Sequence, residues 1–254
     1  MEPRIALRPR AFVRVAGPDA ADYLQRMVSN DVESLEPGSS CEALLLTAKA
    51  RVIAPLRVLR RGADDFLLLT EPELGDRVRS ELTRSRFAAK VEVEPEVHLS
   101  TLVFGEAPEG AVANEDYGRE AWEVLDAELG GEPIGEDELE RMRIEAGTPR
   151  FGREIDDRVL PAEAGLLERA VSFTKGCYPG QEPIARQHHR GRLNRRLRVL
   201  TLEGDTAPEA EIRYGEKVVG RITSAVPGKA LAYVRTEVPS DAELDIDGAK
   251  ARLH

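Results

Sequence analysis

The pattern of apolar residues changes near residue 192 and divides the chain into two kinds of structure. From Leu197 onward, short apolar runs are separated by turn residues, which is typical of a small β-barrel or sandwich. Asp247-Gly248 is a strong signal for a two-residue hairpin loop. We therefore predict that residues 192–254 form an all-β unit, with strands at 197–202, 211–214, 217–223, 230–234 and 243–246.

The first 191 residues mix strand and helix patterns. Helical spacing predicts helices at 20–27, 73–87 and 136–146, and Asp19 is predicted to cap the first of them. Several strands with few intervening helices are typical of an α+β layer with a mainly antiparallel sheet. The predicted strands are 12–15, 41–47, 52–59, 65–70, 91–94 and 99–104, with 122–129 as a strand or short helix.

Charge and cysteine content limit the class of protein. The chain of 254 residues has a net charge of −10, which argues against broad nucleic-acid or membrane-surface binding. Its two cysteines, Cys41 and Cys177, are fewer than a secreted disulfide scaffold would use, and residues 1–10 lack the apolar run of a signal peptide. We expect a soluble cytoplasmic protein without membrane or direct nucleic-acid partners.

The segment around Cys177 carries the most chemistry. Residues 174–183 read Thr-Lys-Gly-Cys-Tyr-Pro-Gly-Gln-Glu-Pro, and their glycines and prolines exclude a continuous helix through the cysteine. Lys175 would lie on the same side as the thiol in extended backbone, where its ammonium favours the thiolate. A helix from Pro183 to about residue 189 would add its positive end. The alternative is an inert cysteine in a structural turn, and Cys41 is predicted to be a buried strand residue.

Residues 175–182 resemble the K-G-C-[FY]-x-G-Q-E signature of YgfZ-type folate-binding proteins and their mitochondrial iron–sulfur assembly relatives. These proteins are a branch of the glycine-cleavage T-protein (aminomethyltransferase) family. The resemblance covers nearly the whole chain and is weakest at 72–135. Other segments similar to family motifs are Gly17-Pro18-Asp19-Ala20, Ser29-Asn30-Asp31-Val32, Arg143-Ile144-Glu145-Ala146-Gly147, Leu160-Pro161-Ala162-Glu163 and Val219-Gly220-Arg221-Ile222-Thr223-Ser224-Ala225.

The resemblance implies a fold of two α+β lobes within residues 1–191, not necessarily in chain order, and a C-terminal β-barrel at 192–254. It also implies tetrahydrofolate, bound non-covalently at a central opening. The residues that we expect to contact it are Asn30, Asp31, Tyr117, Arg143, Glu145 and Arg186. Alternatively, Asn30 and Asp31 are turn caps, Arg143 and Glu145 pair on a helix surface, and Arg186 belongs to a solvated basic face. His188 and His189 point in different directions on a helix, so no metal site is expected.

One departure from the family bears on activity. Aminomethyltransferases carry two aspartates where this chain has Ala54 and Pro55, which cannot orient a folate nitrogen or accept its proton. Classical methylene transfer is therefore not expected, although a folate-dependent one-carbon transferase is the alternative. A second alternative is a binding module in which Cys177 is only structural.

The function that the resemblance implies is iron–sulfur cluster assembly or repair, which would support enzymes such as tRNA-thiolating ones. Cys177 would act as a thiolate that ligates a transient cluster or exchanges with a thiol carrier. The other residues of this candidate catalytic loop are Lys175, Gly176, Gly180, Gln181 and Glu182. The expected partners are folate and iron–sulfur client or carrier proteins.

Overall fold

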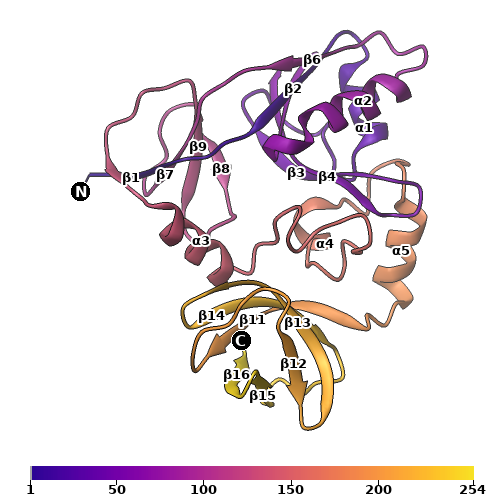
Figure 1. The fold of residues 1–254 in the computed structure, drawn as a ribbon. Helices are drawn as coiled ribbons and strands as arrows, with labels where there is room; N and C mark the ends of the chain where they lie inside the picture. The colour runs from indigo at the N-terminus through magenta and orange to yellow at the C-terminus, as the bar shows by residue number, and fades with distance from the viewer. Residues whose placement is uncertain (1) are drawn as a thin grey trace.

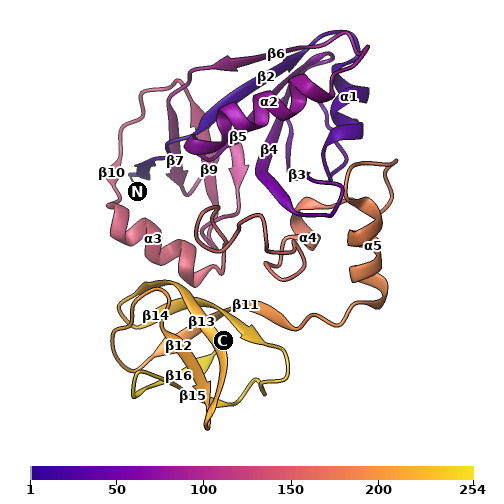
Figure 2. The same cartoon turned by 45° about the vertical axis from the view of Figure 1, so that its right-hand side comes forward.

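A computed structural model describes residues 2–254 and contains two five-stranded sheets and a closed barrel. Figures 1 and 2 show the two sheets next to each other, with the barrel below both. The barrel is the last part of the chain, and the two sheets are built from interleaved segments of the rest.

The first sheet has the strand order β3-β4-β5-β2-β6 and is antiparallel at every pairing. Its strands are β2 (Ala11–Ala16), β3 (Ser40–Leu46), β4 (Val52–Gly62), β5 (Asp65–Thr70) and β6 (Glu92–Glu96). Helices α1 (Ala20–Met27) and α2 (Gly75–Ser85), with the short 3₁₀ turn η1 (Pro72–Leu74), accompany it.

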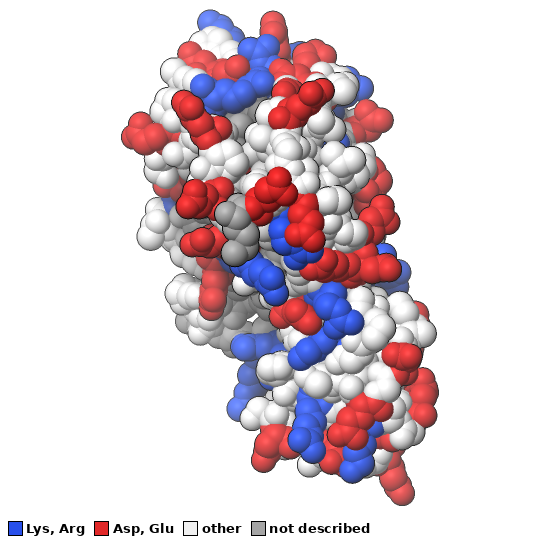
Figure 3. Space-filling model, turned by 90° about the vertical axis from the view of Figure 1, so that its left-hand side faces the viewer, with Lys and Arg blue, Asp and Glu red and all other residues white. Residues whose placement is uncertain are grey.

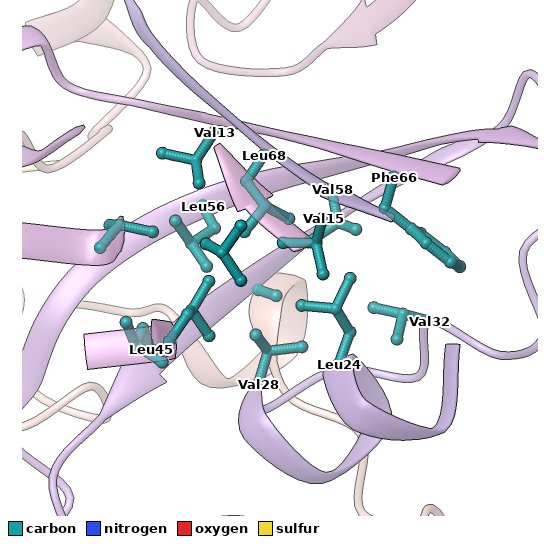
Figure 4. Packing of buried hydrophobic residues seen from close by; sticks show 14 of the residues in the cluster. Val13, Val15, Leu24, Val28, Val32, Leu45, Leu56, Val58, Phe66 and Leu68 are labelled. Atoms are coloured by element: carbon teal, nitrogen blue, oxygen red, sulfur yellow. The ribbon is translucent and has the colours of Figure 1, made fainter. Parts of the chain in front are cut away.

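Both faces of this sheet are buried. Because side chains alternate along a strand, Leu45, Val58 and Leu68 pack on the helix side with Leu24 of α1 (Figure 4). Their neighbours Leu44 and Leu69 belong to the opposite face and are also buried. Burial on both faces explains the uninterrupted leucine runs of β3 and β5.

The second sheet has the order β10-β1-β7-β9-β8 and begins with the N-terminal strand. Its strands are β1 (Arg4–Leu7), β7 (Ser100–Phe104), β8 (Val112–Asn114), β9 (Ala121–Leu125) and β10 (Glu132–Pro133). Strand β1 pairs antiparallel with β7 and parallel with β10. The chain therefore starts in the second lobe, crosses to the first with β2, and returns with β7.

Three helices connect the lobes to the barrel. Helix α3 (Glu136–Glu145) packs on barrel strands β13 and β14, α4 (Leu167–Ala170) contacts β3, and α5 (Gln181–Arg190) leads into the barrel. The barrel strands are β11 (Arg195–Leu202), β12 (Glu211–Tyr214), β13 (Lys217–Val226), β14 (Lys229–Arg235), β15 (Glu243–Ile246) and β16 (Ala249–Leu253). Closure leaves this sheet without an exposed edge.

The predicted α+β body and C-terminal β-barrel are confirmed. At the Asp247-Gly248 hairpin, φ is 52° and 87°, as a two-residue type I′ loop requires. Asp19 is the N-cap residue of α1, as predicted, but its side chain does not bond to the first turn, because Oδ2 instead accepts a hydrogen bond from the backbone N–H of Lys90 at 2.7 Å. The predicted helix at 73–87 is divided between η1 and α2, and α5 begins two residues before Pro183.

The strands that the sequence analysis did not predict are β1, β8, β10 and β16. No helix among residues 2–254 combines the length and apolar character needed to cross a membrane.

Candidate functional site

A small cavity of about 60 Å³, here called the inner cavity, lies where the first sheet meets α4 and the segment 148–155. The sheet contributes Glu42, Pro55 and Arg57, all on the face opposite the helices. The second lobe contributes Asp116, which follows β8, and Arg169 of α4 closes another side. Residues from both lobes therefore meet at this cavity.

The polar side chains of the inner cavity form a continuous network of ion pairs. Arg169 pairs with both Glu42 and Asp116, and Arg57 lies 3.0 Å from Glu42. Arg10 pairs with the buried Glu123 at 2.9 Å and lies 3.8 Å from Asp116. The Nε atoms of Arg57 and Arg169 are buried and have no hydrogen-bond partner among the described residues. Donors without partners in a cavity wall are free to bind a ligand.

Two carboxylates of this network, Asp116 and Glu123, have lowered pKa values and are ionised at neutral pH. Burial alone would raise the pKa of Asp116, but the charges of Arg10, Arg57, Arg169 and Arg8 outweigh burial and lower it. In Glu123, burial is likewise outweighed by Arg10, and the pKa falls to about 2. The wall of the inner cavity therefore presents fixed negative and positive groups together.

A second cavity of about 650 Å³, here called the outer cavity, shares Glu71 with the inner cavity. Its other lining residues include Arg8, whose guanidinium is 2.7 Å from Glu71, and Arg150, Phe151 and Arg153. Ligand-binding clefts in proteins have volumes of roughly 300–1,000 Å³. The outer cavity is therefore large enough for a ligand the size of a folate.

Two of the predicted folate contacts line the outer cavity. Tyr117 is buried, packs edge-to-face on Phe104 with ring centroids 5.6 Å apart, and has its pKa raised by burial. Arg143 also lines this cavity, but its guanidinium is held by Glu140 at 2.8 Å and Glu154 at 2.9 Å. The guanidinium of Arg143 is therefore held in an ion-pair network within the protein, and its contact with folate stays a prediction.

The other predicted contacts lie outside both cavities. The Asn30 side chain donates to the backbone carbonyl of Glu42, and Asp31 accepts from Gln25 at 3.0 Å, so both stabilise the turn after α1. Glu145 is exposed and lies 3.7 Å from Arg141 instead of pairing with Arg143. Arg186 forms an exposed pair with Glu182 on α5.

Cys177 is exposed on the loop that precedes α5 and lines neither cavity. The loop is fixed at Gly180, where φ is 85° and an added Cβ would lie 2.7 Å from the carbonyl oxygen of Thr47. Gly176 has open space on its outer side. The thiol is therefore presented to solvent by a loop that packs on the β3–β4 turn.

Replacing Gly180 by alanine should lower the free energy of unfolding by about 2 kcal/mol, because the left-handed backbone and the contact with Thr47 both resist a side chain. Gly176→Ala, directly before Cys177 in the same loop, is the matched control and should change stability by less than about 0.5 kcal/mol. Urea denaturation of the two variants measures the difference. Equal stability would contradict the close packing of the loop.

Lys175 does not serve the thiol as the sequence spacing suggested. Its Nζ donates to the backbone carbonyls of Val28 at 2.7 Å and Asn30 at 2.8 Å, and also to that of Gln25. Burial lowers the pKa of Lys175 to about 8, against the opposing charges of Asp31 and Glu33, so the ammonium form still predominates at pH 7. The ammonium ties the Cys177 loop to the end of α1.

Cys41 lies in β3, as predicted, and burial raises its thiol pKa to about 12. This second cysteine is therefore protonated at neutral pH and a poor nucleophile.

Sequence reasoning missed the ion-pair network of the inner cavity. One signal was available, because Glu42 and Arg57 interrupt the otherwise apolar runs of β3 and β4 and are direct partners in the register. Ala54 and Pro55 differ in position: Ala54 is fully buried in the first-lobe core, whereas Pro55 lines the inner cavity. Of the two positions where aminomethyltransferases carry aspartates, only that of Pro55 lies in the cavity wall.

Comparisons with known proteins agree on this architecture. Residues 194–254 match the family model described as CAF17, C-terminal beta-barrel domain. The chain is 28% identical to the mitochondrial iron–sulfur cluster assembly factor IBA57 of Mus musculus, covering 90% of this chain and 76% of that protein. It is 27% identical to the tRNA-modifying protein YgfZ of Cronobacter sakazakii, covering 91% and 83%.

The glycine cleavage system aminomethyltransferase T of Bartonella henselae has the same fold, with a TM-score of 0.85 at 18% identity over 100% of this chain and 85% of that one. The chain is therefore a homologue of the YgfZ and IBA57 proteins, with the fold of the glycine-cleavage aminomethyltransferase and a C-terminal barrel of the CAF17 type.

Proposed function

We propose that the protein binds tetrahydrofolate in the inner and outer cavities and supports iron–sulfur cluster assembly or repair through the thiol of Cys177. The observation that carries the proposal is the wall of ionised carboxylates and unpartnered arginine Nε atoms beside a folate-sized cavity. The names of the relatives, an iron–sulfur cluster assembly factor and a tRNA-modifying protein, favour the proposed role in cluster assembly or repair.

The residues present fit a folate. A pterin offers N–H donors and a carbonyl acceptor, which the Asp116 carboxylate and the Nε atoms of Arg57 and Arg169 would complement. The glutamate tail is anionic, and Arg150 and Arg153 of the outer cavity would pair with it. When bound, tetrahydrofolate would supply a one-carbon carrier and a reducing ring.

The alternative, a one-carbon transferase, needs a group that orients the folate nitrogen and accepts a proton. At the cavity wall Pro55 offers only a backbone carbonyl, and that oxygen accepts from Thr70 Oγ1 at 2.8 Å. We therefore expect no methylene-tetrahydrofolate when the protein is incubated with tetrahydrofolate and an aminomethyl donor. Turnover above the protein-free rate would favour the transferase.

Cys177 is the group that we propose to meet the cluster. Its side chain is exposed, and the loop is held at both ends, by Lys175 on α1 and by Gly180 on the β3–β4 turn. A thiol so placed can bind the iron of a cluster in transit, because its S–H proton passes to solvent as the sulfur–iron bond forms. We place this activity in the cytoplasm, where reducing conditions keep the thiol free.

The test is made in cells that lack the protein, by measuring the activity of an enzyme that depends on an iron–sulfur cluster. The proposal expects reduced activity in these cells and recovery when the wild-type protein is restored, with an enzyme that needs no cluster as the control. Unchanged activity in its absence would contradict the role in cluster maintenance.

A further inference from the structure

The end of α5, the linker 191–194 and strand β11 enclose a groove that the proposed folate site does not use. Two cavities of about 510 and 640 Å³ share Gly191, Leu193, Arg196 and Arg198 in their linings, so they lie next to each other along the linker, and together they are here called the linker groove. In Figure 1 this region lies at the right, where α5 descends to the barrel.

The half of the linker groove that faces the barrel has an excess of positive charge, because four arginines line it against the single carboxylate of Glu237. Arg192 and Arg196 are exposed and form no ion pair with a carboxylate among the described residues, and Arg198 donates to the backbone carbonyl of His254 at 2.9 Å. Arg235, on the barrel side, has only a loose, exposed pair with Glu237 at 3.6 Å. On the face shown in Figure 3, by contrast, basic and acidic side chains are interspersed. In a chain of net charge −10, such a cluster attracts an anionic ligand.

One half of the groove also offers apolar contact. Phe173 is 40% exposed, and its ring stacks on His188 with centroids 4.2 Å apart. Leu193 and Leu197 line the same half. A ligand that complements the whole groove therefore combines carboxylates or phosphates with an apolar or aromatic side chain.

These features favour an acidic peptide segment over a nucleic acid. The carboxylates of Glu163 and Glu168 line the aromatic half, so the groove accepts only a short run of negative charge, at the arginines of the other half. The net charge of −10 repels a long polyanion such as a nucleic acid. A peptide can place its acidic residues on the arginines and an apolar residue on Phe173. Arginine also suits carboxylates because its planar fork can bind both oxygens.

The position of the groove relates it to Cys177. The thiol precedes one end of α5 and the groove lies at the other, and the ten residues of this helix span about 15 Å. An extended peptide covers that distance with about five residues. We propose that the linker groove is the docking site of an acidic segment of a thiol or iron–sulfur carrier protein, which brings the carrier's sulfur to Cys177. This inference rests on the proposed role of Cys177.

The test uses a short synthetic peptide with several glutamates, one phenylalanine and one cysteine activated as the 2-thiopyridyl disulfide. The Cys177 thiolate attacks the peptide sulfur, a protein–peptide disulfide forms, and 2-thiopyridone leaves with the electron pair and takes a proton. Absorbance of the released thiopyridone gives the rate, and Cys41→Ala protein removes any signal from the second cysteine. A peptide with glutamines in place of the glutamates is the uncharged reference.

We expect the acidic peptide to react about tenfold faster than the glutamine peptide at low salt, with the ratio falling towards one at high salt. Arg192→Ala combined with Arg196→Ala should remove most of this ratio, whereas Arg213→Ala with Arg221→Ala, elsewhere on the barrel, should keep it. Alkylation of Cys177 by iodoacetamide, which is uncharged, should proceed at the same rate in all these proteins.

Equal rates for the two peptides in the wild-type protein, or an unchanged ratio in the groove variant, would overturn the docking site. So would competition by single-stranded RNA, or by a folate polyglutamate, at lower concentrations than the acidic peptide. Each of these results would leave the requirement for Cys177 in cells untouched, so failure of the docking site is distinguishable from failure of the proposed function.

Discussion

Replacing Cys177 by alanine should reduce the activity of cluster-dependent enzymes to the level of cells that lack the protein. Alanine can neither bind iron nor exchange with a thiol, and Cys177→Ser should fail as well because a hydroxyl does not ionise at neutral pH. The side chain is exposed, so we expect the stability of the variant to change by less than about 0.5 kcal/mol. The measurement is enzyme activity in cells at matched protein levels.

Cys41→Ala is the matched control. Because its thiol pKa of about 12 makes Cys41 inert, the Cys41→Ala variant should lose some packing in the first lobe but still restore the activity of cluster-dependent enzymes. Full recovery of this enzyme activity with the Cys177→Ala variant would refute the role of the exposed thiol, even if the variant folds and binds folate.

Replacing Arg143 by alanine should destabilise the protein by about 3–5 kcal/mol. Its guanidinium joins α3 to the barrel, because it binds Glu140, Glu154 and the Ser224 hydroxyl of β13. The side chain of Glu154 is 0% exposed, so the variant leaves a buried carboxylate without its cation. Chemical denaturation followed by circular dichroism measures the loss.

Two further variants separate the effect of the buried charge on stability from the effect of the lost contacts. Arg141→Ala, on the same helix, loses an exposed pair with Glu145 at 3.7 Å and a hydrogen bond to the carbonyl of Pro227, but leaves no buried charge, and should cost less than about 1 kcal/mol. Adding Glu154→Gln to Arg143→Ala should recover part of the loss, because the buried group is then neutral. A loss below about 1 kcal/mol in Arg143→Ala would mean that the network does not hold the barrel to α3.

Much of the barrel was predictable because half of its pairings are local hairpins. Two-residue turns join β12 to β13, β13 to β14 and β15 to β16, and signals such as Asp247-Gly248 act between neighbours in sequence. Strand β1 was missed because its four residues lie between Pro3 and Pro9 and gain their place only by pairing with β7, about a hundred residues later.

Separation along the sequence also explains why the ion-pair network of the inner cavity was not predicted. Arg10, Asp116 and Glu123 meet because β1 and β2 carry the N-terminus from one lobe to the other, and no spacing in the sequence relates residue 10 to residue 123. Lys175 is a case where closeness in sequence misled the prediction. It lies two residues before Cys177, so its ammonium was expected beside the thiol. Its long side chain instead reaches the free carbonyls at the end of α1, which only the folded chain brings near.

Calorimetric titration of the purified protein with tetrahydrofolate tests most directly whether the charged inner cavity binds a reduced folate. We predict one site per chain, at least about tenfold weaker in Asp116→Asn, which loses a charged acceptor in the cavity wall. The exposed neighbour Glu115→Gln should bind as the wild-type protein does. No binding by the wild-type protein, or equal affinity in Asp116→Asn, would contradict the account.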